Sequence, residues 1–186
     1  MSLAGPVVNN LSLEELKKQS REFLNAGIHG ICFSAYDEGQ QPGDQLSEAQ
    51  VRRKLEILKP HISWVRTFSC TEGNEIIARV AHEMGIKTLV GAWLGDDLEK
   101  NEGEIEGLLE LCAEGVVDVA AVGNEVLYRE DLSAAVLVEY IKRVKAAVTD
   151  VPVGYVDAYY EFTDYPEVAD ACDIILANCY PYWEGC

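Results

Sequence analysis

Glu125 is the residue of this sequence best placed to do acid-base chemistry. It follows the apolar run 116–122 and the pair Gly123-Asn124. Parallel α/β folds carry their reacting groups directly after the strands, and an apolar rim favours the protonated form of a carboxyl group. We therefore expect Glu125 to act as a general acid, with Asn124 binding a ligand hydroxyl group. The alternative is that Glu125 caps the following turn or pairs with Arg129.

Aromatic side chains gather after the same predicted strands. Their faces stack on the apolar faces of sugar rings, and their shared location at one rim predicts a carbohydrate cleft. Taken singly, each could instead be a packing residue. Two polar residues at strand ends, Asp157 and Asn178, are expected to bind the same ligand. The aromatic residues expected to bind substrate are Tyr36, Trp93, Tyr159, Tyr180, Tyr182 and Trp183.

Arg66 interrupts the apolar run 62–69, so its guanidinium must be paired. The simplest partners are carboxylates at the mouth of the predicted fold, which makes Arg66 a candidate substrate-binding residue. A structural salt bridge is the alternative. The three histidines, His29, His61 and His82, do not follow strands and lack the spacing of metal ligands. No metal or organic cofactor is therefore expected.

These residues need elements that bring them to one place. Apolar, β-rich runs alternate with amphipathic segments of helical period, which predicts repeated βα units around a parallel sheet. One further short helix is expected between the last two strands. Expected helices cover residues 12–25, 47–59, 74–84, 99–114 and 133–148, and expected strands cover 28–34, 62–69, 86–94, 116–122, 153–156 and 173–178.

The spacing of the strands favours a (β/α)₈ TIM barrel. One βα unit takes about 30 residues, so eight units need roughly 240 residues, and this chain supplies about six. Residues 1–27 are expected to form an N-terminal lead segment and helix, and residues 28–186 an incomplete barrel. Six strands leave two open sheet edges. An open doubly wound sheet is the alternative, although no glycine-rich nucleotide loop supports it.

Charge and hydropathy narrow the choice of partners. Lys and Arg number 15 against 32 Asp and Glu, a formal net charge of −17, which repels phosphate backbones and anionic lipids. Nucleic acid and membrane partners are therefore not expected, whereas a neutral polysaccharide meets no such penalty. No apolar run approaches about 18 residues, and the N-terminus lacks a secretory layout. We expect a soluble protein, cytoplasmic or exported with its signal removed.

The six cysteines are spread singly through the chain, with no C-x-x-C pair. Cys32, Cys70 and Cys179 fall in apolar, strand-like runs. A reduced thiol in such a run behaves as a small hydrophobic side chain, so these three are expected to be buried. Disulfides remain possible, and spacing alone does not give their pairing.

Several strings in the sequence resemble glycoside hydrolase family 17, the endo-1,3-β-glucanase group. Residues 121–126 (AVGNEV) are similar to its strand-four signature, and residues 178–183 (NCYPYW) to its strand-six motif. Residues 32–36 (CFSAY), 64–67 (WVRT) and 89–94 (LVGAWL) look like its bacterial and fungal members. These strings follow the order and spacing of the family from about Gly30 to Gly185.

The resemblance implies roles for individual residues. Glu125 would be the acid/base, Asn124 would hold a sugar near its 2-hydroxyl group, and Tyr180, Tyr182 and Trp183 would line the cleft. The fold implied is the (β/α)₈ barrel, and no cofactor is implied.

One departure from the family pattern concerns the nucleophile. The family carries a Glu at the end of strand seven in a G-E-x-G-W-P-like context, and no such string occurs here. We expect a retaining hydrolase or transglycosylase of β-1,3-glucan that is inactive as the 186-residue chain. The alternatives are a non-catalytic glucan-binding protein and a chain that self-associates through its open sheet edges.

Overall fold

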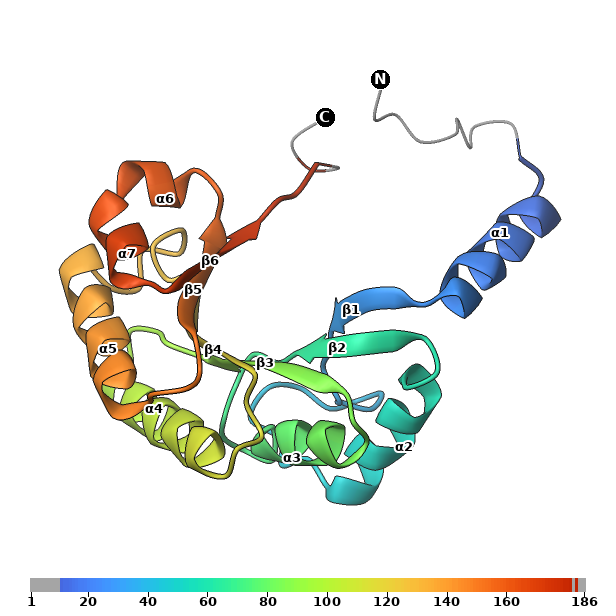
Figure 1. Ribbon diagram of the computed structural model, residues 1–186, viewed down its shortest axis with the longest axis horizontal. Coiled ribbons are helices and arrows are strands. Elements are labelled where there is room, and N and C mark those ends of the chain that lie inside the picture. Colours follow the sequence, from blue (N-terminus) through green and yellow to red (C-terminus); the bar gives the residue numbers. More distant parts are fainter. Residues whose placement is uncertain (1–10, 182, 184–186) are drawn as a thin grey trace.

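A curved sheet of six parallel strands forms the body of the protein, in a computed structural model that describes residues 11–181 and residue 183. The strand order follows the sequence, and every neighbouring pair is parallel. This half-barrel (Figure 1) confirms the predicted partial (β/α)₈ architecture. The strands are β1 (Ile28–Cys32), β2 (Ile62–Arg66), β3 (Lys87–Ala92), β4 (Val119–Asn124), β5 (Val153–Ala158) and β6 (Ile174–Asn178).

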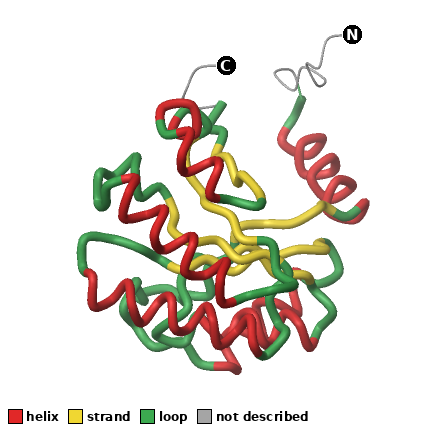
Figure 2. The backbone as a smooth tube through the Cα atoms, turned by 60° about the vertical axis from the view of Figure 1, so that its left-hand side comes forward, coloured by secondary structure: helices red, strands yellow, loops and turns green. Residues whose placement is uncertain are grey.

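The helices that follow β1 to β5 cover the convex side of the sheet (Figures 1 and 2). A doubly wound sheet would carry helices on both faces, so this arrangement excludes that alternative. Side chains cap several helices as the sequence predicts, including the box formed by Ser12 and Glu15. The helices are α1 (Leu13–Ala26), α2 (Glu48–Leu58), α3 (Glu75–Glu83), α4 (Leu98–Ala113), α5 (Ala134–Ala147), α6 (Glu161–Asp164) and α7 (Pro166–Ala171).

Two short helices, α6 and α7, stand where the sequence predicts one. Pro166 is the first residue of α7. Proline disfavours helical backbone in the residue before it, and Tyr165 accordingly has φ −124° and ψ 69°. The helical segment is therefore split at Tyr165.

The core lies between the sheet and the convex helices. One apolar cluster joins β3, β4 and β5 to α4 and α5, with Leu108, Leu137 and Tyr155 fully buried. A second cluster joins β1 and β2 to α2 and α3. Every residue of β4 and β5 is buried, as expected for central strands of a parallel sheet. Candidate site residues that follow β4 therefore rest on the most deeply buried strands of the sheet.

The edge strands β1 and β6 are more exposed than the central ones. Cys70 is buried as predicted, but Cys32 at the end of β1 and Cys179 just after β6 are exposed. The prediction of buried thiols was wrong for these two because each belongs to a sheet edge with a neighbouring strand on one side only. Ile175 in β6 is likewise 49% exposed.

Helix α1 projects from the β1 end of the sheet (Figures 1 and 2). It contains no buried residue, and Leu13 and Phe23 are 66% and 65% exposed. Gly27, with φ 81°, ends the helix and turns the chain into β1. The ring Nδ1 of His61 lies 3.0 Å from the Leu24 carbonyl oxygen, which links α1 to the start of β2.

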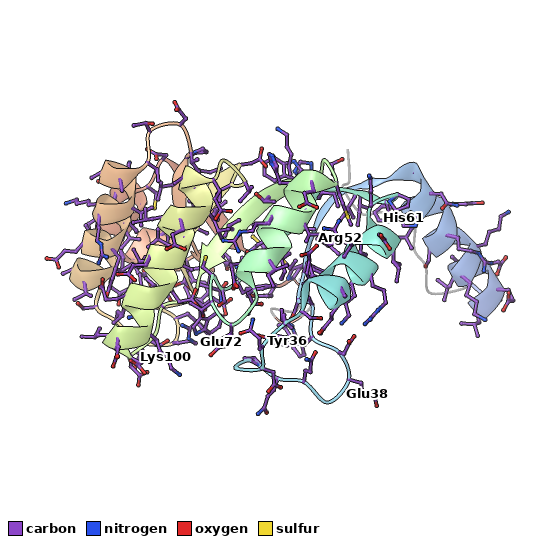
Figure 3. The ribbon with its side chains drawn as sticks, turned by 90° about the horizontal axis from the view of Figure 1, so that it is seen from below. Tyr36, Glu38, Arg52, His61, Glu72 and Lys100 are labelled. Atoms are coloured by element: carbon purple, nitrogen blue, oxygen red, sulfur yellow. The ribbon has the colours of Figure 1, made fainter. Side chains whose placement is uncertain are left out.

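The loops that follow the strands lie along one side of the sheet. Figure 3 shows Tyr36, Glu72 and Lys100, from the segments after β1, β2 and β3, on the same side. His61, which precedes β2, lies on the opposite side. The residues that follow the strands thus lie together at the carboxyl end of the sheet, as the sequence argument requires.

Candidate active site

The turn that carries Glu125 has an unusual backbone. Gly123 has φ 91°, and a Cβ atom there would lie 2.8 Å from Cγ2 of Val126. Glu125 itself has φ 52°, a left-handed conformation that costs a residue with a side chain roughly 1–2 kcal/mol. Its backbone N–H donates to the Val156 carbonyl at 2.7 Å, just past a register shift between β4 and β5. Such conformations concentrate at functional sites, which supports Glu125 as a functional residue.

Two donors approach one oxygen of the Glu125 carboxylate. Asn178 Nδ2 donates to Oε1 at 2.7 Å, and the Tyr180 hydroxyl donates to the same atom. Both hydrogen bonds end on Oε1, and neither uses Oε2. The hydrogen bond to Glu125, followed by burial, raises the pKa of Tyr180 to about 12. The phenol therefore keeps its proton and acts as a donor at neutral pH.

Arg66 joins the ends of three strands. Its Nη2 donates to Asn124 Oδ1, and its Nη1 donates to Asn178 Oδ1 at 3.3 Å. The guanidinium also lies 4.7 Å from the centre of the Phe68 ring. Carboxylate partners were expected; the described acceptors are instead the amide oxygens of Asn124 and Asn178 and, at 3.8 Å, the Cys32 sulfur, because the Glu125 carboxylate is turned toward Asn178 and Tyr180. Arg66 Nε is buried and has no hydrogen-bond partner in the described part of the chain.

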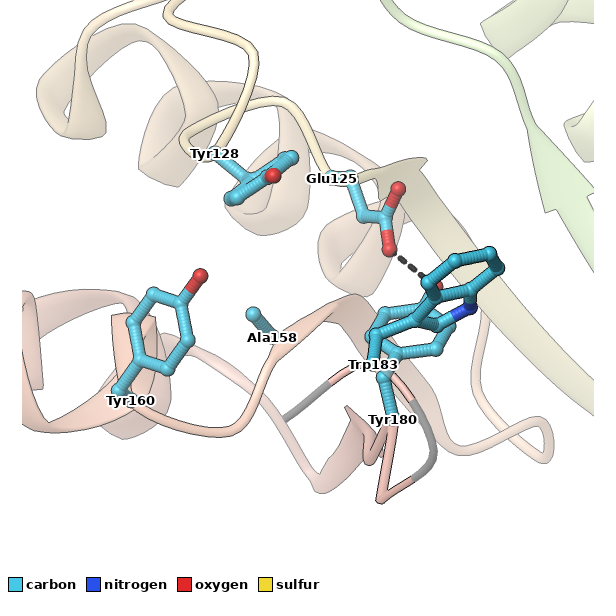
Figure 4. A pocket seen from close by; sticks show the side chains of 6 residues that line it. All are labelled: Glu125, Tyr128, Ala158, Tyr160, Tyr180 and Trp183. Carbon is cyan, nitrogen blue, oxygen red and sulfur yellow. Dashed lines mark hydrogen bonds between the residues drawn. The ribbon is translucent and has the colours of Figure 1, made fainter. Parts of the chain in front are cut away.

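A pocket of about 340 Å³ lies beside Glu125. In Figure 4 the Glu125 carboxylate points toward Tyr180, and Trp183 lines the same pocket. The volume is at the lower end of the range for small-molecule sites. Aromatic rings next to a carboxyl group match the requirements of a sugar site. The pocket is lined by Glu125, Tyr128, Ala158, Tyr160, Tyr180 and Trp183.

Asp157 lies beneath this site and not on its wall, because its side chain has no exposed surface. Its carboxylate accepts hydrogen bonds from the Tyr155 hydroxyl and from the backbone N–H groups of Leu127, at 3.2 Å, and Tyr128, at 3.4 Å. Burial and the hydrogen bond to Asp157 raise the pKa of Tyr155 far above its usual range. Asp157 therefore supports the loop that follows Glu125.

The other residues predicted to bind substrate also follow the carboxyl ends of strands, but farther from Glu125. Trp93, after β3, is 42% exposed, and the guanidinium of Arg129 lies 4.5 Å from its ring centre. Arg129 pairs with Asp131, and no ion pair between it and Glu125 is found. Tyr36, after β1, accepts a hydrogen bond from Asn74 Nδ2 at 3.2 Å.

Two aromatic residues that were predicted to bind substrate, Tyr159 and Tyr182, remain to be placed. The rings of Tyr159 and Tyr160 meet edge to face, with centres 5.3 Å apart. Tyr182 lies outside the described residues. The structure thus brings Asn124, Glu125, Arg66, Asn178 and Tyr180 into one hydrogen-bonded group, with Trp183 beside it.

Sequence reasoning missed Tyr128 and Ala158 as pocket residues. Tyr128 lies three residues after Glu125, and its aromatic type at that spacing was a usable signal. Ala158 carries no such signal, because a small apolar residue at the end of a buried strand is common. Tyr160 lines the pocket as well and was not among the residues expected to bind substrate.

A family model for the BtgE/BtgC glycoside hydrolase domain matches residues 30–186. The chain belongs to this glycoside hydrolase family. The match begins in β1 and includes Glu125 and every predicted site residue. It confirms the resemblance to the family 17 glucanases, which rested on the strings around β4 and β6.

Relatives of this family member are found among fungal enzymes. The glucan 1,3-β-glucosidase of Saccharomyces cerevisiae is 28% identical over 182 residues, covering 88% of this chain and 58% of the relative. A glucan 1,3-β-glucosidase of Schizosaccharomyces pombe is 32% identical over 145 residues, covering 70% and 45%. The chain thus spans about half the length of the curated relatives it matches.

Solved structures agree with the half-barrel. The family 17 β-1,3-glucanosyltransferase of Rhizomucor miehei superimposes with a TM-score of 0.73 at 28% identity, covering 87% of this chain and 60% of that one. A β-glucuronidase of Bacteroides uniformis superimposes with a TM-score of 0.62 at 14% identity, a likeness of fold alone. No helix in the described part of this chain has the length and apolar content needed to span a membrane.

Proposed function

We propose that this glycoside hydrolase acts on β-1,3-glucan, as a retaining hydrolase or transglycosylase, with Glu125 as its acid/base. The observation that carries the proposal is the Glu125 carboxylate at the aromatic pocket, with two donors on Oε1. The names of the fungal relatives, glucan 1,3-β-glucosidases and a β-1,3-glucanosyltransferase, support this substrate class.

The proposed reaction is a double displacement. Glu125 protonates the glycosidic oxygen as a second carboxylate attacks the anomeric carbon, which gives a glycosyl ester and a free leaving-group hydroxyl. Glu125, now ionised, then takes a proton from water or from a sugar hydroxyl, and that oxygen displaces the carboxylate. The first route is hydrolysis and the second is transglycosylation.

The second carboxylate has to lie about 5–5.5 Å from Glu125. We propose that it belongs to a part of the barrel beyond the six strands seen here, and that the 186-residue chain alone does not turn over glucan. The buried Arg66 Nε, which lacks a partner among described residues, is a donor that such a carboxylate could satisfy. Coverage of about half of the relatives also supports this view.

The remaining polar and aromatic residues would bind the sugar. Asn124, held by Arg66, lies next to the catalytic carboxylate and is proposed to contact the 2-hydroxyl group. Tyr128, Tyr180 and Trp183 offer aromatic surface beside it. Tyr36, Trp93 and Tyr159 are proposed to extend the cleft along the same edge. We further propose that residues 1–27 form a lead segment separate from the barrel proper, because α1 contributes no buried residue.

The test is turnover of laminarin-type β-1,3-glucan by the intact gene product. Glu125→Gln keeps the shape of the side chain but removes the transferable proton, and we expect activity to fall by about 10²–10⁴-fold. Glu130→Gln is the matched control, because Glu130 is an exposed carboxylate of the same loop that also has a positive φ. Unchanged activity in Glu125→Gln would remove the proposed acid.

Glu125 is the one carboxylate among the described residues that line the pocket, which also fits a glucan-binding protein without catalysis. Calorimetry with β-1,3-gluco-oligosaccharides separates the two functions. Binding without cleavage after long incubation favours the binding protein, and cleavage that depends on Glu125 favours the hydrolase.

The open edges at β1 and β6, with Ile175 exposed, also permit two chains to associate. Light scattering of the 186-residue chain tests this association, and a purely monomeric species would exclude it.

A further inference from the structure

Arg129 connects three segments at the site edge without touching the Glu125 carboxylate. Its Nη1 donates to the Asn124 carbonyl oxygen, and its Nη2 donates to the Leu94 carbonyl oxygen at 2.8 Å. Its Nε donates to Asp131 at 2.7 Å. The side chains of Arg129 and Asp131 are each only 25% exposed. The guanidinium thus ties the end of β4 to the segment that follows β3.

The same guanidinium supports the Trp93 side chain. It lies 4.5 Å from the Trp93 ring centre, so it covers part of one indole face, and 42% of Trp93 remains exposed. The Trp93 backbone is fixed independently, because its N–H donates to the buried Glu104 carboxylate at 3.0 Å. Glu104 also accepts from Ser69 and from the Cys70 N–H. The remaining freedom of Trp93 is therefore mainly in its ring, which contacts Arg129.

We propose that Arg129 is a positioning residue that couples the Trp93 ring to the Asn124-Glu125 backbone. A sugar stacked on Trp93 is then held in register with the acid/base. This inference rests on the proposed function. A planar group with several donors can bind two carbonyls and stack on a ring at once, whereas a lysine ammonium cannot.

A purely structural role for Arg129 would predict that its loss detaches the loop after Glu125. The loop after Glu125 has a second anchor, because Asp157 accepts the N–H groups of Leu127 and Tyr128. Loss of the Arg129 side chain therefore leaves the loop attached to β5. What it removes is the link between the Trp93 ring and the Asn124 carbonyl, so the effect should fall on ligand alignment.

Kinetics of the intact gene product on laminarin oligosaccharides test this role. We expect kcat for Arg129→Ala to fall by about 10–100-fold, as for other small misplacements at an active site. Arg129→Lys should recover little of the loss, although it keeps the charge beside Asp131. Arg143→Ala is the control, because it breaks an arginine–carboxylate pair with Glu102 between α4 and α5. Wild-type kcat in folded Arg129→Ala would overturn the proposal.

A double-mutant cycle distinguishes coupling from independent damage. If Arg129 acts through Trp93, the variant Trp93→Ala/Arg129→Ala should lose about as much kcat/KM as the worse single variant. Losses that multiply would show that the two residues act separately, and would overturn the coupling.

Fluorescence tests the coupling without any turnover. In the 186-residue chain with Trp64→Phe and Trp183→Phe, Trp93 is the remaining tryptophan. Arg129→Ala should shift its emission and lower its anisotropy, and Arg143→Ala should change neither. An unchanged Trp93 signal overturns the inference whatever the enzyme does. A clear shift, together with an intact wild-type gene product that does not cleave laminarin, would instead refute the proposed function and leave the contact established.

Discussion

At the scale of single residues, the site depends on how one carboxyl group is surrounded. Asn178 and Tyr180 both donate to Glu125 Oε1, and they come from the end of β6, 53 and 55 residues further along the chain. The backbone at Glu125 is left-handed, which turns its side chain away from the direction that strand β4 would otherwise give it. The position of this carboxyl group is therefore set by distant residues as much as by its own strand.

The pH dependence of Tyr180 follows from the same contact. Its pKa is raised from 10 to about 12, chiefly by the hydrogen bond to Glu125 and then by burial. The folded protein thus holds this proton more tightly than the unfolded chain does between pH 10 and about 12. The stability contributed by the group is complete below pH 10 and is lost as the pH rises through about 12.

We therefore expect the unfolding free energy of the wild type to fall more steeply than that of Tyr180→Phe as the pH rises above 10. Urea denaturation at a series of alkaline pH values measures the difference. Glu125→Ala should abolish most of it, because the carboxylate that accepts the phenol proton is then gone. Parallel curves for the wild type and Tyr180→Phe would show that the contact is not formed in solution.

At the scale of elements, the pairing of β5 with β6 leaves no room for a side chain at Gly154. A Cβ atom there would lie 2.4 Å from the Ile174 carbonyl oxygen and 2.9 Å from Ile174 Cγ2. Because β6 carries Asn178 toward Glu125, this tight contact also bears on the site. By contrast, a Cβ atom at Gly103 in α4 would have no neighbouring atom within 4 Å.

The two glycines make a matched pair of substitutions. Gly154→Ala should destabilise the fold by about 1–3 kcal/mol, because overpacking forces the strands apart. Gly103→Ala should stabilise it by up to about 1 kcal/mol, since alanine is the better helix former. Chemical denaturation of the 186-residue chain gives both values. Equal effects of the two changes would contradict the close approach of β5 and β6.

The elements were largely predictable from the sequence, and the contacts between them were not. Apolar period and capping residues placed all six strands and the longer helices to within a few residues, because these signals are local. Tyr165 before Pro166 was the signal for the extra break between α6 and α7. By contrast, the amide partners of Arg66 come from β4 and β6, and no local pattern reports which distant groups a guanidinium will meet. The same reasoning explains why Asp157 was expected on the pocket wall and lies beneath it.

At the scale of the whole molecule, the degree of burial differs strongly from one part of the fold to another. The central strands β4 and β5 are buried throughout, whereas β6 and α1 expose apolar side chains. Leu137 in α5 is fully buried, and Phe23 in α1 is 65% exposed. The contribution of a large apolar side chain to stability should therefore depend strongly on where it lies.

We expect Leu137→Ala to cost about 2–5 kcal/mol of unfolding free energy, as for other buried leucines. Phe23→Ala should change it by no more than about 0.5 kcal/mol, because α1 contributes no buried residue. Urea denaturation followed by circular dichroism measures both variants of the 186-residue chain. A large loss in Phe23→Ala would mean that α1 packs on the barrel body in solution.

The strand order has a consequence for how the protein is made. Each strand pairs with the strand before it in the sequence, in the order β1-β2-β3-β4-β5-β6. A chain leaving the ribosome can therefore add every new strand to an edge that is already assembled, without waiting for residues still to be synthesised. The last strand of the growing sheet keeps unpaired backbone N–H and C=O groups until the next strand has been synthesised. We therefore expect nascent chains of this protein to depend most on chaperones in the interval between two successive βα units.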